Sequence, residues 1–225
     1  MKRKNLVFLL FLFVNHSKAQ TINQIANDLD VVLESYGSLS PFSEVIRRDS
    51  LSLDFLEILE KSSAHLPDSI DPWLLIESAQ FLMDSLFYKL FYHPDFLNHR
   101  PEDVLNTQPT LVSSDGRFYQ YSFDENTGGS YRSRIVYYHY RAADGTVINH
   151  VNKSDENSFF ANDGYYEIHN LPDSLAKPRY LLIGGVFGCN SCLQEYIELL
   201  RYDTTDKQFV SDFSLSIADR GFGSL

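Results

Sequence analysis

Between residues 21 and 108, apolar residues recur at steps of three and four, which is the spacing of one face of an α-helix. The first run predicts a helix that begins after Thr21 and ends before Gly37, because glycine commonly follows the last helical turn. A second run predicts a helix over residues 52–61. The apolar positions that support these two helices are Ile22, Ile25, Ala26, Leu29, Val32, Leu33, Phe55, Leu56, Ile58 and Leu59.

A third helix is predicted from Pro72 to about Tyr92, and it has the strongest pattern. Asp71 is suited to cap its first turn, and proline is well tolerated at the first helical position. We expect the helix to end before Pro94, since proline disfavours helical conformation in the preceding residue. A short fourth helix is predicted after Pro101. The apolar stripe of the third helix consists of Leu75, Ala79, Leu82, Leu86 and Leu90.

After Leu111 the pattern changes to a period of two, which is typical of half-buried β-strands. Seven short runs rich in aromatic and β-branched residues follow one another, and Asp-Gly steps that favour tight turns separate several of them. Because no helical run intervenes, antiparallel hairpins are expected. The sequence therefore predicts an α+β fold, with a helical segment at 20–109 and an antiparallel β-rich segment at 110–225. The predicted strands are residues 116–124, 133–141, 145–151, 164–169, 179–187, 195–203 and 207–215.

The first residues have the pattern of a secretory signal peptide. Three basic residues precede nine apolar residues at 6–14, and Ser17 and Ala19 supply the small side chains of a cleavage site. Nine apolar residues are too few for a helix that crosses a hydrocarbon core of about 30 Å. We therefore predict that residues 1–19 are removed, that the mature chain begins at Gln20, and that the protein is periplasmic or secreted.

The composition limits the classes of partner. The net charge is −11 at pH 7, and loss of four basic residues with the signal peptide would bring it to −15. Such a surface repels phosphate backbones, so nucleic acid is not an expected partner. No later segment is long and apolar enough to span a membrane, so we expect a soluble mature protein without an integral membrane segment.

Residues 113–141 carry a resemblance to a known group of proteins. An Asp-Gly strand, a Gly-Gly loop and an aromatic return strand follow one another, and this run resembles a group of uncharacterised exported α+β proteins of Gram-negative bacteria. The resemblance covers about thirty residues, and it implies export and a mixed fold but no activity. The residues that carry it are Ser114, Asp115, Phe118, Gly128, Gly129 and residues 137–140.

Cys189 and Cys192 are the only cysteines in the sequence, and they form a Cys-x-x-Cys pair. A thioredoxin-like redox site would need most of its sheet and a cis-proline after the pair, but no proline follows Pro178. A zinc site would need two further ligands, and neither a second such pair nor a His-x₃₋₅-His pair is present. We therefore predict a disulfide between the two cysteines, formed in an oxidising compartment, with no metal and no cofactor. Redox and zinc chemistry are the competing interpretations.

One strand suggests a possible binding face. Tyr137, His139 and Arg141 alternate along residues 133–141 and would share one side of a regular strand. If exposed, this row would bind a sugar ring or an extended peptide, because aromatic side chains combine a flat apolar surface with polar tips. Ordinary cross-strand packing is the interpretation that the pattern favours.

The motifs do not point to catalysis. The sequence has no Gly-x-Ser-x-Gly elbow, no His-Glu-x-x-His pair and no Walker loop, and its carboxylate pairs have spacings that an acidic protein acquires by chance. No catalytic residue is therefore predicted. The favoured hypothesis is a non-enzymatic binding or structural module of the cell envelope. The alternative is a hydrolase that acts on an envelope or extracellular polymer with dispersed catalytic residues.

Overall fold

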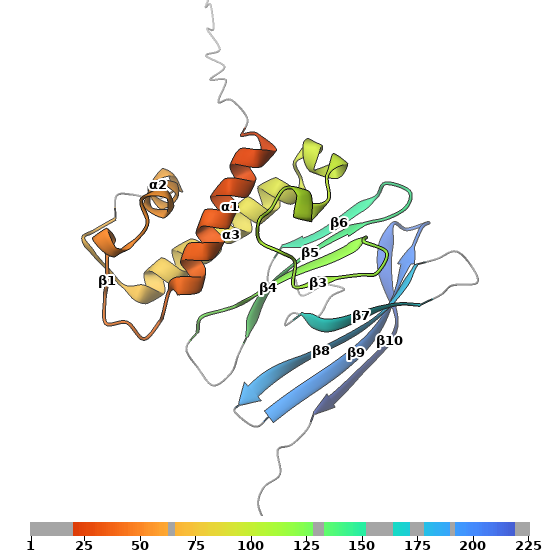
Figure 1. Cartoon of the computed structure of the whole chain (residues 1–225). Helices are drawn as coiled ribbons and strands as arrows, with labels where there is room; N and C mark the ends of the chain where they lie inside the picture. Colours follow the sequence, from red (N-terminus) through yellow and green to blue (C-terminus); the bar gives the residue numbers. More distant parts are fainter. Residues whose placement is uncertain are drawn as a thin grey trace, which may run out of the picture.

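The protein is built in three layers, a helical layer and two antiparallel β-sheets (Figure 1). This arrangement confirms the predicted α+β fold class. None of the helices in the described part of the chain combines the length and apolar character that a membrane span requires. The predicted signal peptide lies outside the described residues. The computed structural model describes residues 20–62, 66–127, 133–151, 164–171, 178–189 and 192–218, with the backbone alone at 151, 186–189, 192–193 and 217–218.

The helical layer contains three α-helices, α1 (Ile22–Ser38), α2 (Leu53–Ser62) and α3 (Pro72–Phe91), within the described residues. Thr21 closes a capping box at the start of α1. Asp71 accepts two backbone N–H bonds at the start of α3, which confirms the predicted cap. The helices also lie where the three-and-four spacing predicts them.

The end of α1 differs from the prediction. Gly37 lies inside the last turn, and the helix continues to Ser38. Tyr36 anchors this turn, because its side chain is buried and its hydroxyl donates to the carbonyl oxygen of Asp124 at 2.7 Å. A glycine within a helix costs only about 1 kcal/mol relative to alanine, so a last turn that is anchored in this way can include Gly37.

Short elements connect the helices to the sheets. Where a short fourth helix is predicted after Pro101, the chain forms a 3₁₀ turn, η3 (Pro101–Asp103). Two further 3₁₀ turns are η1 (Arg48–Ser50), which precedes α2, and η2 (Pro94–Asn98), which follows α3. A two-stranded ribbon of β1 (Ile46–Arg47) and β2 (Ser69–Ile70) was not predicted from the sequence, because two-residue strands are too short to show a period.

The middle layer, here called the central sheet, has the strand order β3-β4-β5-β6, and all its pairs are antiparallel. Gly116 precedes β4 with φ 65°, and Gly145 precedes β6 with φ 83°, so both Asp-Gly steps adopt the left-handed conformation that glycine permits. The strands are β3 (Leu111–Val112), β4 (Phe118–Asp124), β5 (Arg134–Arg141) and β6 (Val147–Val151).

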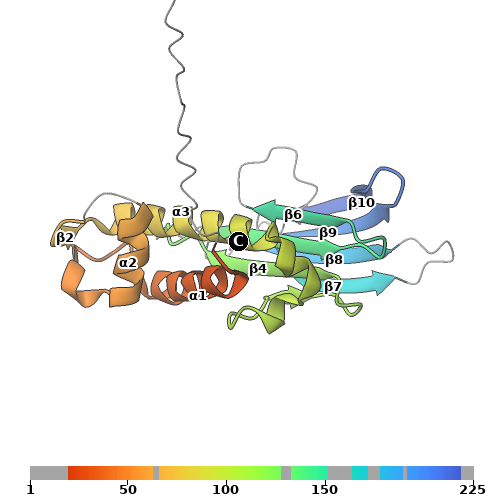
Figure 2. The same cartoon turned by 90° about the horizontal axis from the view of Figure 1, so that it is seen from above.

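The third layer, here called the outer sheet, has the antiparallel order β10-β9-β8-β7. It packs on the side of the central sheet that faces away from the helices (Figure 1). Figure 2 shows that the helical layer extends beyond the two sheets at one end. The strands are β7 (Tyr165–Leu171), β8 (Arg179–Cys189), β9 (Cys192–Asp203) and β10 (Gln208–Ala218).

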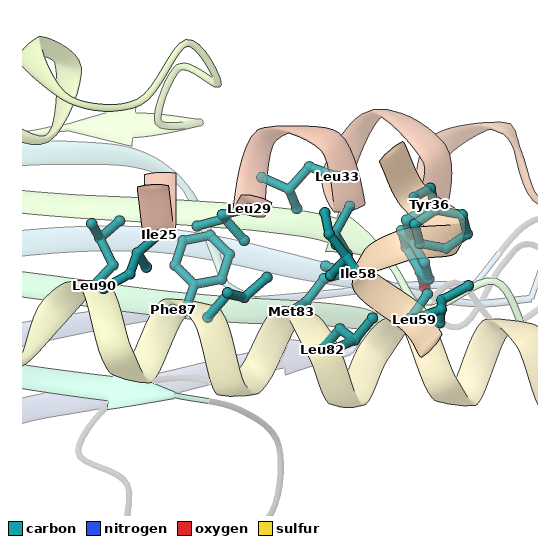
Figure 3. Packing of buried hydrophobic residues seen from close by; sticks show 14 of the residues in the cluster. Ile25, Leu29, Leu33, Tyr36, Ile58, Leu59, Leu82, Met83, Phe87 and Leu90 are labelled. Carbon is teal, nitrogen blue, oxygen red and sulfur yellow. The ribbon is translucent and has the colours of Figure 1, made fainter. Parts of the chain in front are cut away.

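The core consists of two apolar clusters, one on each side of the central sheet. The first joins the three helices to one face of that sheet, with Phe87 between α1 and the strands (Figure 3). The second fills the space between the two sheets and contains Phe118 and Tyr140 from the central sheet. The central sheet is therefore buried on both faces, and the helical and β-rich segments share one core.

Two tyrosines of the first cluster provide a test of this packing. Tyr137 donates its hydroxyl to Asp84 at 2.7 Å, whereas the buried hydroxyl of Tyr121 has no partner among the described residues. Changing Tyr121 to Phe should raise the free energy of unfolding by about 1 kcal/mol, because it removes an unsatisfied buried polar group. Changing Tyr137 to Phe should lower it by about 1.5–3 kcal/mol. Urea denaturation of both variants measures the difference, and equal effects would contradict the assigned hydrogen bond.

Candidate functional site

The possible binding face on β5 is not an exposed row, because Tyr137 and His139 are buried and Arg141 is half-buried. Tyr137, His139 and Arg141 do share one side of the strand, but this side packs against the helical layer. The ring of Phe87 stacks on Tyr137 with centroids 3.9 Å apart, and Phe91 lies 5.1 Å from the imidazole of His139. Of the two alternatives that the sequence left open, packing within a core is the one that the structure bears out.

His139 is the centre of a buried polar network that joins the layers. Arg141 donates its Nε–H to His139 Nε2 at 2.8 Å, so the ring proton lies on Nδ1, which is 2.6 Å from the side-chain oxygen of Asn149. Asn149 donates in turn to the carbonyl oxygen of Phe91 at the end of α3. Burial, together with the charge of Arg141, lowers the pKa of His139 to about 4. The network thus holds α3 on the sheet with a neutral imidazole.

Arg141 completes the contact with η2. Its guanidinium lies over the ring of Phe96, 5.2 Å from the centroid, and donates to the carbonyl oxygens of Phe96 and Leu97. The carbonyl of Phe96 also accepts from the backbone N–H of His99 at 3.2 Å, so Arg141 adds side-chain donors to a 3₁₀ turn that is already capped. The polar tips of the row are therefore bound within the protein, Tyr137 and His139 by side chains and Arg141 by His139 and two backbone carbonyls.

The cysteine pair lies at a hairpin. Strand β8 ends at Cys189, β9 begins at Cys192, and the two residues are partners in the antiparallel register. A thioredoxin-like site places its second cysteine in a helix, whereas Cys192 begins a strand. Cα atoms of directly opposed residues are about 4.5–5.5 Å apart, within the usual range of about 4.4–6.8 Å for disulfides. The side chains, and hence the predicted disulfide itself, lie outside the described residues.

Metal and small-molecule sites have little support in the described residues. Within those ranges, no group of three or more His, Cys, Asp or Glu side chains is arranged to hold a metal ion. A polar cleft of about 200 Å³ lies between the two sheets. Three hollows of about 320, 380 and 610 Å³ lie in the helical layer, but polar and charged residues make up most of their lining, whereas ordinary ligand pockets are lined mainly by apolar side chains. Gln120 bridges the sheets at the cleft, since its side chain donates to the carbonyl of Tyr165 and accepts from its amide. The cleft is lined by Thr110, Gln120, Ser122, Arg134, Gly164, Tyr165, Tyr166 and Gly185.

The most distinctive surface is the outward side of the outer sheet. Tyr180, Leu182 and Leu200 point inward and are buried against the central sheet, so their neighbours in β8 and β9 point outward. The register aligns these outward residues with those of β10 in two adjacent rows of three. We call the six residues the outer patch: Leu181, Leu199 and Phe213 in one row, and Ile183, Ile197 and Leu215 in the next.

The outer patch is apolar where polar residues are ordinarily found. Phe213 is 49% exposed and Leu215 43%, and the other four members are partly exposed. An antiparallel sheet with one free face usually alternates apolar residues inward with polar residues outward. The sequence does carry a signal of this exception, because residues 180–183 and 199–200 are consecutively apolar instead of alternating. Such runs predict a strand that is covered on both sides.

Polar groups surround the outer patch. At one end, Arg201 pairs with Asp203 at 2.9 Å and with Asp212 at 3.3 Å, while Arg179 lies 3.7 Å from Asp212. Two positive and two negative groups thus compensate each other. Along β7, Glu167 and His169 lie 3.0 Å apart. An apolar centre with a polar rim is the usual anatomy of a protein interface.

A second set of exposed apolar residues lies along α3, but it is less continuous. Leu74, Phe81 and Tyr88 are spaced by seven residues, so successive members lie about 10.5 Å apart along the axis of α3. Glu77 and Ser85 lie between them. The outer patch, whose members are adjacent on neighbouring strands, is therefore the stronger candidate site.

Comparison of the chain with protein-family models, curated proteins and solved structures gives no match at any part of the sequence.

Proposed function

We propose that this protein is an exported, non-enzymatic binding module of the cell envelope, and that it binds a polypeptide partner through the outer patch. The observation that carries the proposal is the pair of apolar rows on the outward side of the outer sheet. Export is supported by the signal-peptide pattern of residues 1–19 and by the resemblance of residues 113–141 to exported proteins.

Covering the patch would contribute several kcal/mol toward binding. The exposed half of Phe213 presents roughly 100 Å², since an aromatic side chain buries about 150–250 Å² in all. At about 25 cal/mol per Å², covering it contributes roughly 2.5 kcal/mol. Covering Leu215 contributes a smaller free energy of the same kind, and covering the four partly exposed members contributes further. A few well-covered side chains of this kind dominate most protein interfaces.

The chemistry of the patch favours a polypeptide over a glycan. Five of its six members are aliphatic, whereas sugar rings are best bound by flat aromatic side chains. The neighbouring charged side chains are already paired within the protein, so they need no opposite charge from a ligand. The net charge of −11 favours approach of a neutral or basic partner. The proposed partner is thus a protein surface with clustered apolar side chains.

The proposal can be tested by site-specific photo-cross-linking in cells that produce and export the protein. A photoreactive residue in place of Ile197, at the centre of the patch, should form a discrete adduct with one other polypeptide. The additional change Leu199→Lys should abolish the adduct, because a lysine in the apolar row must be desolvated on binding. A synthetic peptide from the cross-linked segment should then bind the wild-type protein and not the Leu199→Lys variant.

A matched control uses Leu53, an exposed leucine of α2 that lies outside the patch. Neither a photoreactive residue at position 53 nor the change Leu53→Lys should reproduce these effects. The same adducts from both positions, or none from position 197, would rule out the outer patch as the binding site.

A further inference from the structure

Strand β10 forms one edge of the outer sheet and pairs only with β9 within the described residues. It is eleven residues long, and it exposes Ser214 and Ser216 toward one side and Phe213 and Leu215 toward the other. The backbone N–H and C=O groups of alternate residues along such an edge are available to another strand.

This edge has few of the features that prevent pairing between molecules. Proteins commonly protect edge strands with lysine, proline, inward charges or bulges. Residues 208–218 contain no proline and no basic residue, and their single charged side chain, Asp212, is paired with Arg179 and Arg201. The one register shift against β9 falls between Ser211 and Phe213, which leaves residues 213–218 as a regular strand.

We propose that β10 pairs antiparallel with β10 of a second copy of this chain, about a two-fold axis at Leu215. An antiparallel strand pair is the arrangement that two-fold symmetry produces at a sheet edge, because each residue then has the same environment in both copies. Within the regular run 213–218, an axis at residue 215 pairs residues 213–217 of the two copies with one another. In this register Leu215 faces Leu215 of the second copy, and Ser214 faces Ser216.

The proposed pairing is compatible with the charges. The only charged residue of the strand, Asp212, would lie opposite position 218, which is an alanine. The two Asp212 side chains would be separated by about six residues of strand, or roughly 20 Å. No like charges therefore meet across the axis, although both copies are strongly acidic.

The pairing also extends the proposed binding site. Ile183, Ile197 and Leu215 form one row across β8, β9 and β10. With the axis at Leu215, this row continues without interruption into the same row of the second copy, so that six aliphatic side chains line up across one eight-stranded sheet. The proposal that the enlarged surface binds a partner rests on the proposed function. The pairing of the two β10 strands does not, because it is inferred from the features of the edge strand alone.

Cysteine substitutions test the register directly. Wild type, which keeps the two native cysteines, is the control for any disulfide that forms through them. Leu215→Cys should give a disulfide-linked dimer under mild oxidation, because the two positions face each other at the axis. Phe213→Cys is the matched control, on the same strand, the same face and with similar exposure. Its two copies would be four residues apart along the strands, about 13 Å, so it should not link. A linked dimer from Phe213→Cys and not from Leu215→Cys would overturn the register.

Charge variants on the opposite side of β10 test the dimer without altering the outer patch. Sedimentation should show the wild type in a monomer–dimer equilibrium. In the double variant Ser214→Lys, Ser216→Lys, each lysine faces a lysine of the second copy. The dissociation constant of the dimer should rise on the order of tenfold or more. Ser214→Lys with Ser216→Glu places opposite charges face to face and should restore the dimer. A wild type that stays monomeric up to the solubility limit, or two charge variants that behave alike, would refute the proposal.

The failure of this inference can be distinguished from the failure of the proposed function. The photo-cross-link from position 197 tests the outer patch in either oligomeric state. An adduct with a different polypeptide from a monomeric protein would retain the binding function and reject the dimer. The other outcome is that position 197 cross-links only to a second copy of this chain and that Leu199→Lys also abolishes the dimer. This result would reject both the edge pairing and the separate partner.

Discussion

Replacing Phe87 by alanine is expected to lower the free energy of unfolding by about 3–5 kcal/mol, the usual cost of removing a fully buried aromatic ring. Phe87 has no exposed surface and lies where the helical layer meets the central sheet (Figure 3). Its ring stacks on Tyr137 at 3.9 Å and lies 5.3 Å from Phe91 and 5.4 Å from Tyr121. The substitution would leave a cavity that two rigid layers cannot readily close.

Phe81 supplies the matched control on the same helix. It is 69% exposed, so the change Phe81→Ala should alter stability by less than about 1 kcal/mol. Urea denaturation followed by circular dichroism would measure both variants. Because helices and sheet share the first core cluster, a single cooperative transition is expected for each. Separate unfolding of helix and sheet in the wild type, or equal losses in the two variants, would show that Phe87 does not join the layers.

Acid should destabilise the protein through His139 by about 3 kcal/mol between pH 6.5 and pH 4. An unfolded histidine binds a proton below about pH 6.5, whereas burial keeps the pKa of His139 near 4 in the folded protein. Below pH 6.5 the unfolded state therefore binds more protons than the folded state, and the free energy of unfolding falls as the pH falls. Each unit of difference between the two pKa values corresponds to about 1.36 kcal/mol.

The variant His139→Gln isolates this effect. Glutamine can still donate and accept hydrogen bonds but does not titrate, so the variant should lose part of its stability at every pH while its pH profile becomes flatter. The measurement is the difference between the profiles of wild type and variant from pH 7 to pH 4. Glu198, whose pKa is raised by burial, changes stability in the opposite direction, and the subtraction removes its contribution. Two parallel profiles would show that His139 titrates normally in the folded state.

Local patterns in the sequence were sufficient to predict most of the elements. The period of an apolar run depends only on backbone geometry, so the stripe of α3 and the alternation of β4 and β5 are visible without any tertiary contact. Asp71 and the glycines of the Asp-Gly steps act within a few residues of themselves, and their roles were correspondingly predictable. The α+β fold class follows from the order of these elements.

The layers that cover each face were decided only by the tertiary structure. An alternating strand has two sides, and the sequence of β5 does not state which of them meets a helix, a second sheet or solvent. In the folded protein the row of Tyr137, His139 and Arg141 is covered by α3 and η2, so the packing alternative applies to this side of β5. Conversely, Ile197 and Leu199 are large apolar residues, yet the structure places them, partly exposed, on an outward face of the described chain.

The same limit applies to helix ends and edge strands. Gly37 has the local character of a helix stop, but the distant contact of Tyr36 with Asp124 extends α1 beyond it. Nothing within residues 208–218 indicates that β10 lies at an edge, because strand order depends on how the whole sheet assembles. Periods, caps and turns are short-range properties and could be read from the sequence; burial, exposure and strand neighbours arise from contacts between distant segments and required the fold.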